Sequence, residues 1–151
     1  MSLERNKSVT RRFIEEIWNN RQLDVADEIF APDCITHQLR SGGNLTMPRG
    51  PEALKYHVTE WLSAFPDIHI VIEQMLADAD LVMTQCVYQG THSGIWNGVP
   101  PSGKVITIQV SVVHRIVKGL IVEDWVLVDS LGLFQQLGVV PPTAELFPQA
   151  S

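Results

Sequence analysis

The chain has 151 residues, of which 45% are hydrophobic and 19% are charged. This length and balance are typical of one soluble globular domain, here residues 1–151, that buries its own core. The formal net charge of -6 argues against nucleic acid or an anionic membrane as a partner, because both require a basic face. Residues 2–10 are polar and charged, so we expect no secretion signal, no membrane span and a cytoplasmic location.

Apolar residues with helical spacing occur in the first part of the chain. A stripe predicts an amphipathic helix that ends near Asn19 and Asn20; it consists of Val9, Phe13, Ile14, Ile17 and Trp18. A short helix over residues 23–30 and an extended piece over residues 34–39 follow. After a glycine- and proline-containing loop, residues 41–50, Gly50 and Pro51 start another helix. It ends at Pro66, and its apolar face carries Leu54, Val58, Trp61, Leu62 and Phe65.

From Asp67 onward the apolar period changes from 3.6 to 2, which indicates strands. Ile68, Ile70 and Ile72 alternate with their neighbours, and three runs rich in β-branched residues follow over 81–91, 104–117 and 120–129. Turns at residues 79–80 and 118–119 predict antiparallel neighbours. A loop over residues 94–103 and a final short helix over 131–137, capped by Ser130, complete the chain. Helices followed by a meander predict an α+β fold, a cone in which a curved antiparallel sheet and N-terminal helices enclose a pocket.

The sequence contains no motif typical of a metal site, a catalytic nucleophile or a cofactor site. Cys34 and Cys86 lie far apart in apolar runs, which favours small buried thiols over a disulfide or a zinc site. His37, His92 and His114 show no i, i+2 or i, i+4 spacing, so we expect no metal. Because no nucleophile elbow, phosphate cradle or dinucleotide fingerprint is present, we expect no cofactor.

Strand alternation sorts the side chains of the last two strands into faces. We expect Trp125, Leu127 and Asp129 to face the pocket. Asp124 and the valine row of Val122, Val126 and Val128 would then face outward. Since a valine row exposed to water is unfavourable, we expect a homodimer or a higher homo-oligomer that packs sheet against sheet.

Two polar residues in the middle of the 104–117 strand fit a wet or ligand-filled pocket. Gln109 and Ser111 share one face of that strand, and a buried polar side chain without a partner costs about 1–3 kcal/mol. The alternative is that this face simply contacts solvent.

Asp129 follows the last strand and precedes the last helix. Beside Trp125 and Leu127 its carboxylate would be desolvated, which raises its pKa and suits proton transfer to and from carbon. The alternative is an N-cap that bonds the first amides of the final helix. Position alone favours the cap at least as much as catalysis.

Short motifs along nearly the whole chain resemble, in order, those of the SnoaL-like polyketide cyclase family. They are Phe30-Ala31-Pro32-Asp33-Cys34, His37, Arg49-Gly50-Pro51-Glu52-Ala53, Phe65-Pro66-Asp67, Thr91-His92-Ser93-Gly94, Gly98-Val99-Pro100-Pro101-Ser102-Gly103, Lys118-Gly119-Leu120-Ile121-Val122-Glu123-Asp124-Trp125, Asp129 and Leu131-Gly132-Leu133-Phe134-Gln135-Gln136-Leu137-Gly138. The resemblance implies the nuclear-transport-factor-2-like superfold, related to ketosteroid isomerases. Many relatives carry histidine where this chain has Asp124.

The resemblance also implies a function: cofactor-independent ring closure of a polyketide ester by intramolecular aldol condensation. The matching acid/base is Asp129, and His92 would join it in the catalytic site by bonding substrate oxygens. Substrate-binding positions would be His37, Gln109 and Ser111, with walls of Trp125, Trp61 and Phe65 for a flat apolar carbonyl substrate. A non-catalytic binding module of the same fold and a polyketide hydroxylase-like relative are the alternatives.

Overall fold

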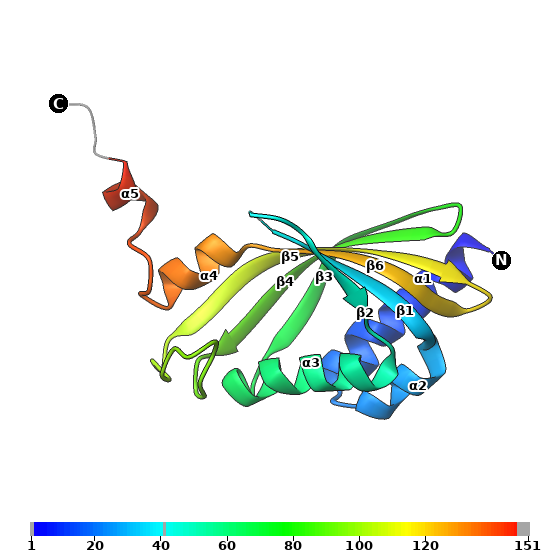
Figure 1. Ribbon diagram of the computed structural model, residues 1–151, viewed down its shortest axis with the longest axis horizontal. Helices are drawn as coiled ribbons and strands as arrows, with labels where there is room; N and C mark the ends of the chain where they lie inside the picture. The colour runs from blue at the N-terminus through cyan, green and yellow to red at the C-terminus, as the bar shows by residue number, and fades with distance from the viewer. Residues whose placement is uncertain (1, 41, 148–151) are drawn as a thin grey trace.

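The N-terminal apolar stripe forms a continuous helical segment on one side of a curved sheet (Figure 1). In the computed structural model, which describes residues 2–40 and 42–147, helix α1 (Leu3–Arg12) runs directly into a π-helical segment, Phe13–Asn19. This confirms the predicted helix end. Phe13, Ile14, Ile17 and Trp18 of the stripe are buried, because this face packs against the sheet.

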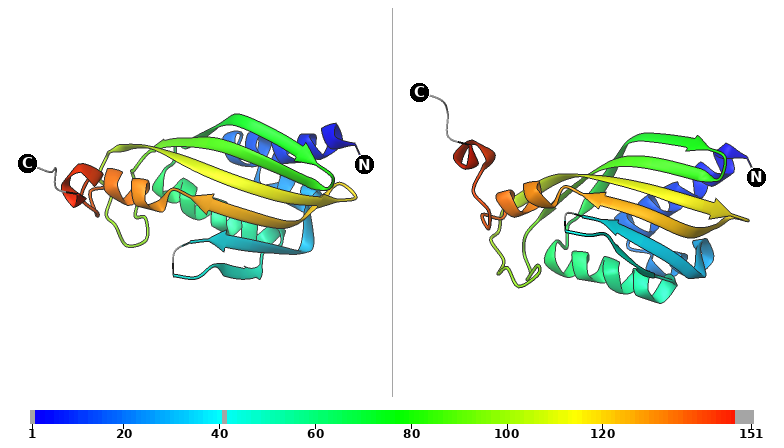
Figure 2. Two further views of the ribbon diagram at one scale, coloured as in Figure 1. Left: turned by 90° about the horizontal axis from the view of Figure 1, so that it is seen from above. Right: turned by 45° about the horizontal axis from the view of Figure 1, so that its top comes forward.

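Of the next two predicted helices, the first is shorter in the structure than predicted and the second begins where it was predicted to begin. The segment predicted over residues 23–30 consists of a 3-10 turn, Leu23–Val25, and the short helix α2 (Ala26–Ile29), and the chain becomes a strand at Phe30. Helix α3 (Pro51–Ala64) begins with its proline in the first turn, as predicted. Helices α1, α2 and α3 all lie on the same side of the sheet (Figures 1 and 2).

Six strands form one sheet in the order β2-β1-β6-β5-β4-β3. Their bounds are β1 (Phe30–Leu39), β2 (Leu45–Pro48), β3 (His69–Asp78), β4 (Leu81–Thr91), β5 (Val105–Val117) and β6 (Leu120–Val128). The long runs of β-branched residues thus form the central strands, as the period of 2 predicts. Strand β2 was not predicted: it lies within the predicted loop 41–50, of which Ser41 is outside the described residues.

The strands are joined by hairpins and by one pairing between segments that are distant in sequence. Strands β3 and β4, and β5 and β6, are antiparallel neighbours as predicted, with positive φ at Ala79 (50°), Lys118 (52°) and Gly119 (80°) in the turns. Strands β1 and β6 pair in parallel instead, and Thr36 lies opposite Asp124. The expectation of a wholly antiparallel sheet was therefore wrong for this pair. Nothing local in either segment specifies a parallel partner so distant in sequence.

The predicted inward and outward faces of β6 are exchanged in the structure. Leu127 is 51% exposed, whereas Val126 and Val128 line the interior cavity and Asp124 is completely buried. The residues that share a face were predicted correctly, but the side on which the helices pack was wrong. Alternation gives a period of 2 and carries no information about which of two mixed faces the helices cover.

The cysteines and the C-terminal helices complete the fold. Cys34 and Cys86 are buried free thiols, as predicted. Helix α4 (Ser130–Gln136) is capped by Asp129 rather than Ser130, and the chain turns away from it at Gly138, with a φ of 79°. The short helix α5 (Thr143–Leu146) follows. Among the described residues, no helix combines the length and apolar character that a membrane crossing requires.

Candidate functional site

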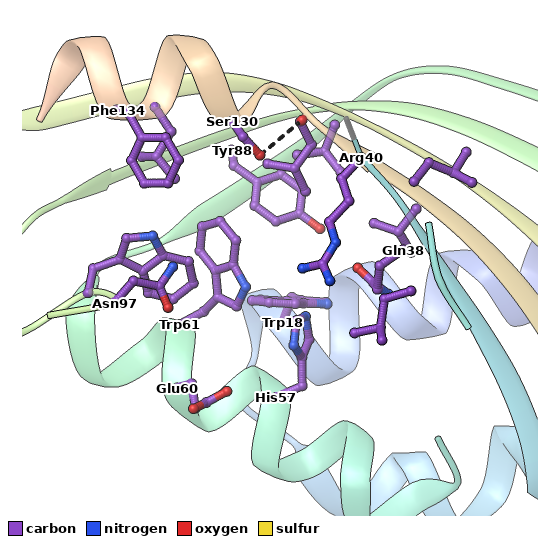
Figure 3. Close-up of a pocket in the computed structure, with 17 residues that line it drawn as sticks. Trp18, Gln38, Arg40, His57, Glu60, Trp61, Tyr88, Asn97, Ser130 and Phe134 are labelled. Atoms are coloured by element: carbon purple, nitrogen blue, oxygen red, sulfur yellow. Dashed lines mark hydrogen bonds between the residues drawn. The ribbon is translucent and has the colours of Figure 1, made fainter. Parts of the chain in front are cut away.

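An interior cavity of about 460 Å³ lies between the sheet and α3 and opens at the end of the molecule where α4 lies (Figure 3). Its floor comes from the inward faces of β4, β5 and β6, and its side from α3. The rim combines four segments that are distant in sequence: the β1–β2 connection, α3, the loop before β5, and α4. The residues that line it are Trp18, Gln38, Leu39, Arg40, Leu45, His57, Glu60, Trp61, Tyr88, Trp96, Asn97, Val110, Val126, Val128, Ser130, Leu133 and Phe134.

Aromatic rings form the walls of this cavity. Trp61 lies with its ring centroid 4.3 Å from that of Trp96, and Trp18 lies 5.5 Å from Tyr88. The indole Nε1 atoms of Trp18 and Trp96 are buried and have no hydrogen-bond partner within residues 2–40 and 42–147. Flat apolar walls suit a planar molecule.

His57 brings a titratable group into the cavity. It lies one helical turn before Trp61 on α3, so both side chains point to the same side. Burial, together with the positive charge of Arg49, lowers its pKa from 6.5 to about 4, and Asp124 partly opposes this shift. The imidazole is therefore neutral at physiological pH and can accept a proton or a hydrogen bond.

Tyr88 and Arg40 supply donors from two other elements. Tyr88 lies on β4, Arg40 follows β1, and Figure 3 shows both side chains directed into the cavity together with His57. Burial raises the pKa of the Tyr88 phenol, which therefore keeps its proton. A phenol and a guanidinium that face the same cavity can stabilise negative charge that develops on a carbonyl oxygen.

A buried ion pair stands behind the cavity wall. Arg49 donates from one terminal nitrogen to Asp124 Oδ2 at 2.8 Å, and both residues are buried. The Asp124 Oδ1 atom accepts a hydrogen bond from Thr36 Oγ1 at 2.5 Å. Gln38, which reaches the cavity, bonds to the same hydroxyl at 2.6 Å. No local pattern in the sequence places Asp124 inside, since its partner Arg49 lies in a loop 75 residues away.

Of the sequence-predicted site residues, Trp61 lines the cavity and two others lie behind its wall. Phe65 is fully buried, 5.8 Å from the Trp61 ring and 5.5 Å from the imidazole of His92. His92 Nδ1 accepts a hydrogen bond from the Ser102 backbone N–H at 3.1 Å, so the ring proton lies on Nε2. His92 thereby fastens the loop over residues 94–103, which carries Trp96.

Asp129, Gln109 and Ser111 line a second, open hollow of about 800 Å³ on the other face of the sheet. The Asp129 Oδ1 atom accepts the Gly132 backbone N–H at 2.9 Å, which is the helix-cap geometry. The two hollows adjoin, because they share Leu39, Arg40, Asn97, Val128, Ser130 and Phe134. Asp129 is thus near the rim of the interior cavity and does not line it.

His37 and Trp125 form a separate cluster on the outer face. Their rings stack with centroids 5.1 Å apart, and His37 Nε2 lies 2.6 Å from a Glu123 carboxylate oxygen. The Arg115 guanidinium lies over the same indole at 5.6 Å. This stacking uses the surfaces that a substrate ring would contact, and neither residue lines the interior cavity.

His57 was not predicted as a site residue, although its spacing in the sequence weakly indicates that it faces the cavity. His57 follows Leu54 by three positions and precedes Trp61 by four, so it belongs to the apolar face of its helix. A stripe defined by apolar residues alone omits it. In the described ranges, no group of three His, Cys, Asp or Glu side chains is arranged to hold a metal ion.

Comparisons with known proteins agree with this architecture. The family model described as SnoaL-like polyketide cyclase matches residues 8–137. No curated protein sequence matches the chain significantly. Among solved structures, IdmH from Streptomyces antibioticus, a proposed polyketide cyclase, is 29% identical with a TM-score of 0.76, over 88% of this chain and 98% of that one.

Two further solved structures show the same fold at lower identity. AclR from Streptomyces galilaeus, a proposed hydroxylase, has a TM-score of 0.81 at 23% identity, over 96% of this chain and 89% of that one. A proposed SnoaL-like polyketide cyclase from Jannaschia has a TM-score of 0.79 at 22% identity, over 91% and 94% of the two chains. At these identities the likeness shows the fold alone.

Proposed function

The chain belongs to the SnoaL-like polyketide cyclase family, and from this premise we propose that its interior cavity closes a ring in a flat polyketide-like carbonyl substrate without a cofactor. One observation carries the proposal. A neutral imidazole, a protonated phenol and a guanidinium line the same aromatic-walled cavity. Abstraction of a proton next to a carbonyl group needs a base of this kind and donors for the resulting enolate.

In the proposed aldol reaction, His57 takes a proton from the carbon between two carbonyl groups of the substrate. The electron pair of the C–H bond moves onto a carbonyl oxygen, which Tyr88 and Arg40 stabilise by donating hydrogen bonds. The enolate carbon then attacks a second carbonyl carbon of the same molecule, and the new alkoxide takes the proton back from His57. Because burial disfavours the imidazolium, this return is favourable. A base of such low pKa suits only a carbon that two carbonyl groups acidify.

The resemblance to characterised cyclases implies Asp129 as the acid/base instead. Asp129 lies near the rim and does not line the interior cavity, and one of its carboxylate oxygens is bonded to Gly132. We therefore assign the proton transfer to His57, and the two assignments make opposite predictions for single variants.

The test uses an ester of 4-(2-formylphenyl)-3-oxobutanoic acid, in which the carbon between the ketone and the ester attacks the formyl carbon; loss of water from the six-membered aldol product then gives a fluorescent 3-hydroxy-2-naphthoate. We expect His57→Gln to lower kcat/KM by roughly 10²-fold or more, and Tyr88→Phe by a similar factor because an enolate donor is lost. Asp129→Asn, in which the amide still caps α4, should stay near the wild-type rate. Loss of activity in Asp129→Asn with retention in His57→Gln would transfer the role to Asp129. Tight binding of the ester without turnover by the wild type would favour a non-catalytic binding module.

A homodimer that packs through the outer sheet face is part of the proposal. That face exposes apolar side chains on β3, β4 and β6, Val71 (51%), Met83 (45%) and Leu127 (51%), and their exposure favours burial against a second copy of the chain. Light scattering of the purified protein should give the mass of a dimer or larger, and Leu127→Glu should shift it to the monomer. A monomeric wild type at micromolar concentration would refute this interface.

A further inference from the structure

Gln38 connects the cavity to the buried ion pair. It is the last inward-facing residue of β1 and lies at the cavity wall, near the Arg40 guanidinium (Figure 3). Behind it, hydrogen bonds run from Gln38 Nε2 to Thr36 Oγ1 (2.6 Å) and from Thr36 Oγ1 to Asp124 Oδ1 (2.5 Å). The chain of bonds ends at Arg49, which donates to Asp124 Oδ2 at 2.8 Å.

The Asp124 carboxylate determines which group donates in each of these hydrogen bonds. The Asp124 carboxylate in its salt bridge with Arg49 has only acceptor atoms. The proton between Asp124 and Thr36 must therefore be the single hydroxyl proton of Thr36. With that proton used, the Thr36 oxygen can only accept from Gln38. Gln38 must turn its NH₂ group toward Thr36, and the opposite rotamer of the amide would place two acceptors against each other.

We infer that Gln38 selects the substrate by presenting its amide oxygen, a fixed acceptor, to the cavity. The group bound there must carry a hydrogen-bond donor, which is an enol or phenol hydroxyl rather than a methoxy or carbonyl oxygen. This inference rests on the proposed binding of a flat oxygenated molecule in the cavity, and does not depend on His57 as the base.

The donors on the other walls complement this acceptor. Tyr88 and Arg40 present an O–H group and N–H groups to the same space. A substrate in the cavity would thus meet donors at its carbonyl oxygens and an acceptor at its hydroxyl. A 1,3-keto-enol or a hydroxyaryl ketone has this arrangement, and a fully methylated analogue does not.

Calorimetric titration with 2-naphthol and 2-methoxynaphthalene tests the inference, because these two flat molecules differ at one hydroxyl proton. The measured quantity is the ratio of their dissociation constants, compared between variants. We expect wild type to favour 2-naphthol, and Gln38→Met to reduce this preference by roughly threefold to tenfold, the usual range for one neutral hydrogen bond. Gln89→Met, the same substitution at an exposed position of β4, is the matched control and should keep the wild-type ratio.

Variants at Thr36 separate orientation from simple contact. Thr36→Val removes the hydroxyl that fixes the amide, so Gln38 can turn and the preference should fall although Gln38 is present. Thr36→Ser keeps the hydroxyl and should restore it. An unchanged ratio in Gln38→Met, or in Thr36→Val while the protein remains folded, would overturn the role of Gln38 alone. Failure of wild type to bind either compound would overturn the proposed occupancy of the cavity, and with it the proposed function.

Discussion

Removal of one partner from the Arg49–Asp124 pair tests whether this buried pair is needed for the fold. Asp124 is completely buried and Arg49 is 5% exposed, so Asp124→Asn leaves an uncompensated positive charge inside the protein. Breaking such a pair is expected to reduce the free energy of unfolding by about 3–5 kcal/mol. In a domain of this size, each kcal/mol corresponds to a decrease in Tm of roughly 2–4 °C. The decrease should therefore reach about 10 °C.

The assay is urea unfolding, followed by circular dichroism and tryptophan fluorescence, on a complete double-mutant cycle. Asp124→Asn and Arg49→Met should each be strongly destabilising, and the double variant should lose less than the sum because neither charge is left unpaired. Asp80→Asn is the matched control. It breaks a half-exposed pair of similar length, Arg115 to Asp80 at 2.9 Å, and should change stability far less. A loss below about 1 kcal/mol for Asp124→Asn would refute the reasoning, because an unpaired buried charge costs several times more.

Burial and capping lead to three more predictions. The pKa values of His57 and His114 are about 4 in the folded protein and ordinarily 6.5. The unfolded chain therefore binds protons first, and urea titrations should show stability falling as the pH decreases from about 6.5 to about 4; constant stability over that window would contradict it. Burial raises the pKa values of Cys34 and Cys86 to about 12. A disulfide reagent at about pH 8 should therefore react slowly with both thiols until the protein is unfolded. Rapid labelling of the native state would count against their burial. Asp129→Ala should cost about 1 kcal/mol in urea unfolding through the lost cap of α4, and Asp129→Asn far less; equal losses would rule out capping as the cause.

The elements of this fold could be predicted from the sequence because their signals are local. The apolar period changes from 3.6 to 2 near Asp67, and this change separates helices from strands within a few residues of the observed bounds. The turns at residues 79–80 and 118–119 then give both hairpins. The parallel pairing of β1 with β6 has no such signal, since it joins segments that only the complete sheet brings together.

The candidate site was harder to predict because its location depends on a choice between two similar faces. Trp125 is a large aromatic residue, which favours an inward position, yet it stacks on His37 outside. Asp124 is charged, which favours an outward position, yet Arg49 neutralises it inside. In both cases a partner that is distant in sequence reverses the preference of the residue itself. Gln109 and Ser111 were predicted to face the pocket for the same reason, and they lie instead on the outer face of the sheet with Trp125.

The β1–β6 pairing also bears on when the protein can fold during synthesis. Strands β3, β4 and β5 can pair with one another as they leave the ribosome, since each partner is adjacent in sequence. Strand β1 is made before them and can pair with β2 on one edge, but its other edge stays unpaired until β6, the last strand, is made, and its apolar residues Phe30 and Cys34 lack their final contacts until then. Arg49 likewise has no ion-pair partner until Asp124 has been made. The nascent chain therefore exposes an unpaired strand edge over most of its translation, a period in which a chaperone or a second nascent copy has access to it.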